Sequence, residues 1–363
     1  MENTNTPPLD SQENTQQQST RDILEYDVAI IGAGPAGLAA AIKLKQQDTD
    51  GTLTICVLEK AAEIGSHSLA GAVLEPRALD ELLPEWREKA TANGVTLTAA
   101  GADKFKYLTK KGSVCLPTPP QMHNKGNYIT SLAQLTRYLA SEAELLGVDV
   151  LPGFTAQSAL VDGQTVYGVR TGDFGRDKDG NPTEGFAEGP DVHAKVTLFG
   201  EGCRGHITKS LVPVLGLDSD RCPQTYGQGI KEIWRVKPEN HDEGKVIHTI
   251  GFPMDSKTYG GGWIYHMADN KISIGYVVGL DYTDPTLMPT NLMQRFKEHP
   301  EVAKLLEGAE LLSAGGRALY EGGLQSQYRL AVDGALFIGD TAGFLNVPKI
   351  KGIHTAMKSG MLA

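Results

Sequence analysis

The sequence has little cysteine, no excess of positive charge and no long run of apolar residues. Its four cysteines, Cys56, Cys115, Cys203 and Cys222, are scattered without a C-x-x-C pair. That spacing argues against a zinc or iron–sulfur site and fits a reducing compartment. The formal net charge of −10 argues against nucleic acid and against polybasic attachment to anionic lipid. The longest uncharged apolar stretch, 28–42, is interrupted by glycine and proline and is shorter than the ~20 residues of a spanning helix.

Residues 1–22 consist largely of Asn, Gln, Thr and Ser, with few apolar side chains. Such a composition cannot bury enough surface to offset its ordering entropy, so a disordered tail is predicted. Its single arginine, Arg21, is outnumbered by acidic residues, which is unlike a mitochondrial transit peptide. A bacterial origin is therefore favoured over a eukaryotic one.

A dinucleotide-binding pattern follows this tail. The apolar run 28–31 predicts a buried parallel strand, and a G-x-G-x-x-G sequence leads from it into an alanine-rich helix. In such a unit Gly32 permits the tight turn, Gly34 lets the backbone approach a pyrophosphate, and Gly37 lets the helix lie close to its strand. A second predicted strand ends at Glu59, where a carboxylate can accept hydrogen bonds from a ribose. A glycine-rich turn in another kind of α/β protein is the alternative.

Three later segments add features of a flavin site. Small residues around Gly71 would let the chain pass close to a flat ring system. An apolar strand at 195–199 ends in a glycine-rich loop that contains Gly202, and a buried strand near 335 ends in Gly339 and Asp340. Between these, 226–278 contains short strands separated by turns, which predicts a mostly antiparallel second sheet.

The segment 105–122 has a different character. Apolar residues alternate with Pro117, Pro119 and Pro120 without a regular period, and lysines flank the segment. Proline excludes a helix here, so an irregular loop is predicted. Such a loop either packs on its own domain or presents an apolar surface to lipid or to a hydrophobic ligand.

Several motifs together resemble the electron transfer flavoprotein–ubiquinone oxidoreductase family. They are GNYIT at 126–130, PQTYGQGIKEIW at 223–234, TYGGGWIYH at 258–266, GYVVGLDY at 275–282 and NVPKIKGIHTAMKSGMLA at 346–363. The resemblance implies an α/β FAD-binding Rossmann-like domain of the glutathione reductase superfamily type, with an inserted β-rich quinone-binding domain. It implies an enzyme that passes electrons from reduced electron transfer flavoprotein to ubiquinone, using FAD and a 4Fe-4S cluster. It also implies peripheral attachment to a membrane surface.

The resemblance assigns ranges and residues. The FAD-binding domain would comprise 23–104, 131–216 and 315–363, and the membrane-contacting quinone domain 105–130 and 217–314. The expected cofactor residues are Gly32, Gly34, Gly37, Glu59, Gly71, Gly202, Gly339 and Asp340, and the expected quinone residues are Tyr259, Gly260 and Gly261. Glu59 would bind the adenosine ribose and Asp340 the ribityl–phosphate region. Electron transfer needs no protein nucleophile, so we expect no catalytic acid or base.

One departure concerns the iron–sulfur cluster. The family continues into a module with four cysteine ligands, whereas this sequence ends at Ala363 and none of its cysteines falls at those positions. We therefore expect a sequence truncated before that module, with no metal ligands in it. The expected location is the cytoplasmic face of a bacterial inner membrane, or the mitochondrial inner membrane if the source is eukaryotic. The alternatives are an isoprenoid (geranylgeranyl-type) flavin reductase of the same fold and an inactive FAD-binding fragment.

Overall fold

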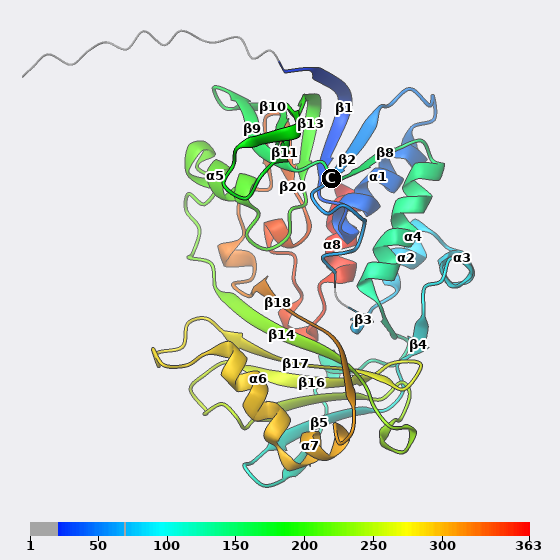
Figure 1. The fold of residues 1–363 in the computed structure, drawn as a ribbon, viewed down its shortest axis with the longest axis vertical. Helices are drawn as coiled ribbons and strands as arrows, with labels where there is room; N and C mark the ends of the chain where they lie inside the picture. Colours follow the sequence, from blue (N-terminus) through cyan, green and yellow to red (C-terminus); the bar gives the residue numbers. More distant parts are fainter. Residues whose placement is uncertain (1–20, 69) are drawn as a thin grey trace, which may run out of the picture.

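The computed structural model describes residues 21–68 and 70–363, so most of the predicted disordered tail at 1–22 lies outside the described residues. Two large sheets organise the chain (Figure 1). An α/β part contains β1, β2 and β13, and a β-rich part contains β14, β16 and β17. The predicted α/β class with an additional β-rich region is therefore confirmed.

The sheet of the α/β part has eight strands. Its main path runs β19-β20-β13-β1-β2-β8, and the pairs of β1 with β13, β1 with β2, β2 with β8, and β13 with β20 are parallel. Antiparallel strands β10 and β9 extend it from β13. The strands are β1 (Ile23–Ile31), β2 (Ile55–Glu59), β8 (Asp149–Pro152), β9 (Ala156–Asp162), β10 (Thr165–Thr171), β13 (Asp191–Phe199), β19 (Ala331–Val332) and β20 (Ala335–Phe337).

Both faces of this sheet are covered, which explains the unbroken apolar run in β1. Ile30 packs with α1 (Pro35–Gln47), α4 (Leu132–Leu145) and α8 (Ile353–Leu362) on one face. Ala29 and its neighbours pack toward α5 (His206–Leu215) on the other. Because successive side chains of a strand point to opposite faces, each residue of the apolar run 28–31 reaches one of two cores.

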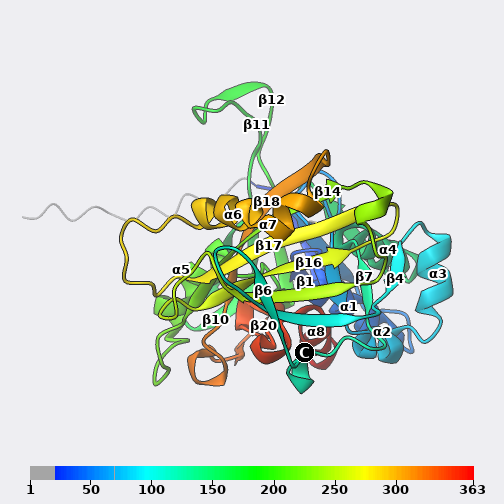
Figure 2. The same ribbon diagram turned by 90° about the horizontal axis from the view of Figure 1, so that it is seen from below.

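Smaller elements surround this sheet. The strands β3 (Ala72–Leu74), β7 (Tyr128–Thr130) and β4 (Leu97–Ala99) form an antiparallel sheet in the order β3-β7-β4. Two short helices, α2 (Arg77–Leu82) and α3 (Trp86–Ala92), lie between β3 and β4 along the chain. The hairpin of β11 (Phe174–Arg176) and β12 (Pro182–Ala187) projects away from the rest of the molecule (Figure 2).

The β-rich part is a seven-stranded sheet in the order β18-β14-β17-β16-β15-β5-β6. It is antiparallel except for the parallel pair β15 and β5. Its strands are β5 (Asp103–Leu108), β6 (Ser113–Leu116), β14 (Tyr226–Arg235), β15 (Val246–Gly251), β16 (Gly260–His266), β17 (Lys271–Gly279) and β18 (Glu310–Tyr320). Helices α6 (Pro289–Glu298) and α7 (Pro300–Leu305) cover one face, where Ile274 and Phe296 are buried. The predicted boundary between 314 and 315 falls inside β18.

The prediction of an irregular loop at 105–122 is wrong. Strands β5 and β6 form an antiparallel hairpin, and a 3-10 turn, Pro120–Met122, follows. The three prolines lie after β6, so their missing N–H groups interrupt no ladder hydrogen bond. Tyr107 and Val114 face each other across the hairpin and are 46% and 58% exposed. Among the described residues, no helix is long and apolar enough to cross a bilayer.

Candidate functional site

The glycines of the G-x-G-x-x-G motif meet different surroundings. Gly32 has φ +103°, and a Cβ there would lie 2.5 Å from the carbonyl oxygen of Gly200. A Cβ at Gly37 would lie 2.2 Å from the carbonyl oxygen of Gly32, so the helix could not approach its strand. A Cβ at Gly34 would meet no atom within 4 Å. Packing of the chain therefore explains Gly32 and Gly37, whereas Gly34 borders open space at the start of α1.

Glu59 lies at the carboxyl end of β2, beside this turn. One of its carboxylate oxygens accepts a hydrogen bond from the Ala33 N–H at 3.1 Å, and the other accepts one from the Ala61 N–H at 2.9 Å. The carboxylate is thus fixed against the motif by two backbone donors. Each oxygen keeps a further lone pair for a ribose hydroxyl.

A second group of predicted residues lies next to the motif. A Cβ at Gly339 would come within 2.7 Å of the Ala36 side chain, and the Gly339 N–H donates to Ser359 Oγ of α8 at 2.8 Å. The hydroxyl of Thr341 donates to the carbonyl of Gly202 at 3.3 Å. The ends of β1, β13 and β20 therefore converge, as expected for the switch-point edge of a parallel sheet.

Asp340 is the carboxyl group of this second group. Burial raises its pKa to about 6, although nearby Arg317 and the backbone N–H of Cys203 act in the opposite direction. Its Oδ1 is inaccessible to solvent and has no hydrogen-bond partner among the described residues. A buried acceptor without a donor costs free energy. We therefore expect a ligand to supply the missing donor.

These observations fit FAD. Gly34 leaves room at a helix N-terminus, where unpaired N–H groups and the helix dipole favour a diphosphate. Glu59, at the end of β2, offers acceptors to a ribose. Asp340 offers an unused acceptor at the same sheet edge, after β20, with β13 and β1 between the two strands. Glu201, in the loop after β13, serves the local fold: its carboxylate accepts hydrogen bonds from the N–H groups of Ile207 and Thr208 in the first turn of α5.

Gly71 lies away from the motif, at the junction with the β-rich sheet. It has φ +73°, and a Cβ there would lie 2.2 Å from the Ser273 side chain on β17. Its carbonyl oxygen accepts from Ser273 Oγ and from Lys231 Nζ, both at 3.3 Å. The amine of Lys231 is deeply enclosed, and burial lowers its pKa to about 8. The loop at 70–71 thus rests on the face of the sheet that carries Lys231 and Ser273.

The predicted quinone residues lie at the start of β16 in the same sheet. Tyr259 is 54% exposed, and its carbonyl accepts from the Gly279 N–H at 2.9 Å. Gly260 has φ +141°, and a Cβ at Gly261 would lie 2.4 Å from the carbonyl oxygen of Thr249. Crowding between neighbouring strands therefore already requires glycine at these two positions, apart from any ligand.

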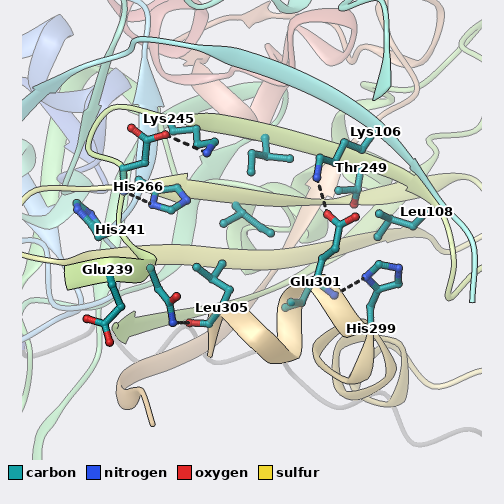
Figure 3. Close-up of a pocket in the computed structure, with 15 residues that line it drawn as sticks. Lys106, Leu108, Glu239, His241, Lys245, Thr249, His266, His299, Glu301 and Leu305 are labelled. Carbon is teal, nitrogen blue, oxygen red and sulfur yellow. Dashed lines mark hydrogen bonds and ion pairs between the residues drawn. The ribbon is translucent and has the colours of Figure 1, made fainter. Parts of the chain in front are cut away.

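A hollow of about 410 Å³ lies on the opposite face of the sheet (Figure 3). Ile247 and Ile264 contribute from the strands, while His241 and Leu305 come from the segments that cover them. Glu301 on α7 accepts a hydrogen bond from Lys106 in this hollow. The hollow lies on one face of the β-rich sheet and the loop at 70–71 lies on the other, because successive side chains of a strand point to opposite faces. The hollow is therefore separate from the predicted cofactor residues.

The sequence prediction missed three side chains that face the two groups of predicted residues: Lys231, Arg317 and Glu321. None belongs to a nucleotide-binding pattern. The available signal was the charged pair Lys231 and Glu232 inside the predicted strand GIKEIW.

The fold and this site define an FAD-binding flavoprotein with a second, β-rich domain. Residues 25–188 match the family model described as "FAD binding domain". A geranylgeranyl bacteriochlorophyll reductase-like protein from Thermoplasma acidophilum is similar in structure, with a TM-score of 0.69 and 19% identity over 93% of this chain and 77% of that one. A flavoprotein/dehydrogenase from Cytophaga hutchinsonii gives 0.64 and 19% over 93% and 76%. These likenesses concern the fold alone.

Sequence similarity identifies the family. Residues 226–319 match the model described as "ETF-QO, ubiquinone-binding". The electron transfer flavoprotein-ubiquinone oxidoreductase of Oryza sativa is 50% identical over 94% of this chain and 60% of its own length. That of Pseudomonas aeruginosa is 47% identical over 94% of this chain and 63% of its own length. The chain belongs to the electron transfer flavoprotein–ubiquinone oxidoreductase family, and it spans about three fifths of the length of these relatives.

Proposed function

We propose that this chain passes electrons from reduced electron transfer flavoprotein to ubiquinone through bound FAD. One observation carries the proposal: the ubiquinone-binding family model covers β14 to β18, which include β14 and β17, the two strands that the loop at 70–71 contacts. FAD, when bound, supplies a redox centre that exchanges electrons singly or in pairs. A flavin can therefore connect a one-electron protein donor with a two-electron quinone.

The residues of the α/β part would bind and orient FAD. The backbone at Gly32, Gly34 and Gly37 would hold the diphosphate, Glu59 the adenosine ribose, and Asp340 the ribityl–phosphate region. Gly71, Gly202 and Gly339 would let the chain pass close to the cofactor. The N-terminus of α8, at Ile353, would direct its positive end toward the flavin and stabilise added negative charge by ~0.3–2 kcal/mol.

The quinone head group would lie near Tyr259, Gly260 and Gly261. This proposal draws on the ubiquinone-binding match and on the exposure of Tyr259. Because both glycine backbones already pair within the sheet, the exposed Tyr259 side chain is the group best able to contact a head group.

Attachment to a membrane surface would use the hairpin of β5 and β6. Tyr107, Val114 and Leu116 are exposed on it, and Lys104 and Lys110 lie beside them. Strands paired in a hairpin satisfy more of their backbone groups than an irregular loop, which favours contact with the headgroup boundary. For a bacterial source, we place the protein at the cytoplasmic face of the inner membrane, and for a eukaryotic one at the mitochondrial inner membrane.

A 4Fe-4S cluster is expected for the family, but no group of three or more His, Cys, Asp or Glu side chains suited to a metal occurs within 21–68 and 70–363. We therefore assign no electron-transfer step of this chain to a cluster. Iron analysis and low-temperature paramagnetic resonance of the purified 363-residue protein should give no stoichiometric signal. A stoichiometric cluster would contradict this assignment.

The test is an anaerobic titration of the FAD-loaded protein with reduced electron transfer flavoprotein, followed by addition of a short-chain ubiquinone. The flavin absorbance should bleach with the donor and return with the quinone. A matched titration with a geranylgeranyl substrate tests the reductase alternative, and it should leave the reduced flavin unchanged. Failure of both donor and quinone to change the spectrum would refute the proposal and favour an inactive FAD-binding chain.

A further inference from the structure

One carboxyl group lies between the predicted cofactor residues and the predicted quinone residues. Glu321 follows β18 directly, and its backbone N–H donates to the carbonyl of Thr225 at 2.8 Å, which fixes its position beside the start of β14. Its Oε2 is inaccessible to solvent and has no hydrogen-bond partner within the described part of the chain. The proposed function assigns no role to this residue.

Two opposed glycines create the space that Glu321 occupies. Gly227 on β14 pairs directly with Gly279 on β17, so both lie on one face of the sheet. A Cβ at Gly227 would lie 2.5 Å from Glu321 Oε1. A Cβ at Gly279 would lie 2.9 Å from an oxygen of Asp281 and 3.3 Å from the ring of Tyr259. Four separate segments of the chain therefore bring Glu321, Asp281 and Tyr259 together over this pair.

This face is the one turned toward the α/β part. Gly227 and Ile233 of β14 are six residues apart, as are Gly279 and Ser273 of β17, so all four lie on the same face of the sheet. Ile233 and Ser273 contact the loop at Gly71. Glu321 thus shares the face that receives this loop. It lies on the side of the sheet away from α6 and α7.

The charges around Glu321 favour its protonated form. Burial raises its pKa to about 7, and the negative charge of Asp281 contributes in the same direction. Tyr259 and Cys203 also interact with Glu321, and both are neutral near pH 7 because burial raises their pKa values. Arg317 is a cation on the same face of β18, and it acts on Cys203 and Asp340. The backbone N–H of Cys203 in turn favours the ionised form of Asp340. Glu321 therefore connects the surroundings of Asp340 with those of Tyr259.

We propose that Glu321 is the proton donor for quinone reduction at this site, an inference that rests on the proposed function. A quinone gains two electrons and two protons when it becomes a quinol. Bound FAD, when reduced, would supply the two electrons and release its own proton to solvent. One proton would pass from the Glu321 carboxyl to the quinone oxygen beside Tyr259, and the other would come from solvent at the opposite carbonyl. The resulting Glu321 carboxylate recovers its proton from solvent, which completes the cycle.

The test separates proton-coupled from simple electron transfer. FAD-loaded protein is reduced anaerobically with dithionite and mixed either with a short-chain quinone or with ferricyanide, which takes an electron without a proton. In Glu321→Gln, oxidation of the reduced flavin by quinone should slow by roughly 100-fold, as expected for loss of a general acid. Oxidation by ferricyanide should keep its wild-type rate. Glu321→Asp, with normal FAD content, should recover part of the quinone rate.

Two pH measurements complete the test. The wild-type quinone rate should fall as pH rises through about 7, and Asp281→Asn should move this fall to lower pH because it removes a nearby negative charge. An infrared or ¹³C titration of the carboxyl groups should contain one component near pH 7 that is absent in Glu321→Gln. If quinone oxidises the reduced flavin of Glu321→Gln at the wild-type rate, the proposed role of Glu321 is refuted and the proposed function is unaffected. A wild-type protein oxidised by ferricyanide but not by quinone would overturn the proposed function as well.

Discussion

Substitution of Gly34 by valine should remove FAD binding while leaving the apo fold intact. A side chain at Gly34 would enter open space, since its Cβ would meet no atom within 4 Å. The residue has φ −83° and ψ 178°, an extended conformation that valine adopts readily. The free energy of unfolding of the apo protein should therefore change by less than about 0.5 kcal/mol.

The effect on FAD follows from the backbone donors at the start of α1. If the valine side chain displaces the diphosphate from two N–H groups, the loss is ~1.5–3 kcal/mol for each charge-assisted hydrogen bond. The total of roughly 3–6 kcal/mol corresponds to a weakening of FAD binding by about 150- to 20,000-fold.

Gly37→Ala is the matched control, because its Cβ would lie 2.2 Å from the carbonyl oxygen of Gly32 and 3.0 Å from the Ile30 side chain. Overpacking of this kind should lower the free energy of unfolding of the apo protein by about 1–3 kcal/mol. The assay combines denaturant unfolding of both apo variants with fluorescence titration of FAD. A Gly34→Val protein that unfolds early, or that binds FAD with wild-type affinity, would refute the reasoning.

Three further predictions concern other parts of the site. The pKa of Asp340 is raised from 3.8 to about 6 in the folded protein, so ionisation of this carboxyl group as pH rises lowers the free energy of unfolding. Between pH 4 and 6 the apo wild type should thus lose about 2 kcal/mol of unfolding free energy relative to Asp340→Asn, measured by urea unfolding, and parallel curves would contradict this. Replacement of Tyr107, Val114 and Leu116 by serine should release the FAD-loaded protein from liposomes of mixed anionic and neutral lipid. It should also raise the KM for a long-tailed quinone more than the KM for a short-chain quinone. Equal changes in the two KM values with retained liposome binding would show that the hairpin only packs against its own domain. Gly261→Ala should lower the free energy of unfolding by about 1–3 kcal/mol, since its Cβ would lie 2.4 Å from a carbonyl oxygen, and an unchanged urea midpoint would exclude that clash.

The sequence determined the nucleotide-binding part because its constraints are local. A strand, a turn that needs φ > 0 at Gly32, and a helix that needs a small residue at Gly37 follow one another directly within 23–47. Each constraint therefore appears as a residue type at a fixed spacing. The β-rich region was also predictable, because short strands and turns alternate along 226–278.

Only the tertiary structure decided how the hairpin and the carboxyl group at Glu321 are placed. The prolines at 117–120 suggested an irregular segment, but the strand β5 is stabilised by β15, whose sequence lies more than a hundred residues later. Glu321 likewise has no recognisable motif. Its surroundings arise from the register that places Gly227 opposite Gly279, and a one-residue shift would turn these positions to the other face. Because register depends on the packing of both faces of the sheet, no stretch of sequence near Glu321 specifies the site that it occupies.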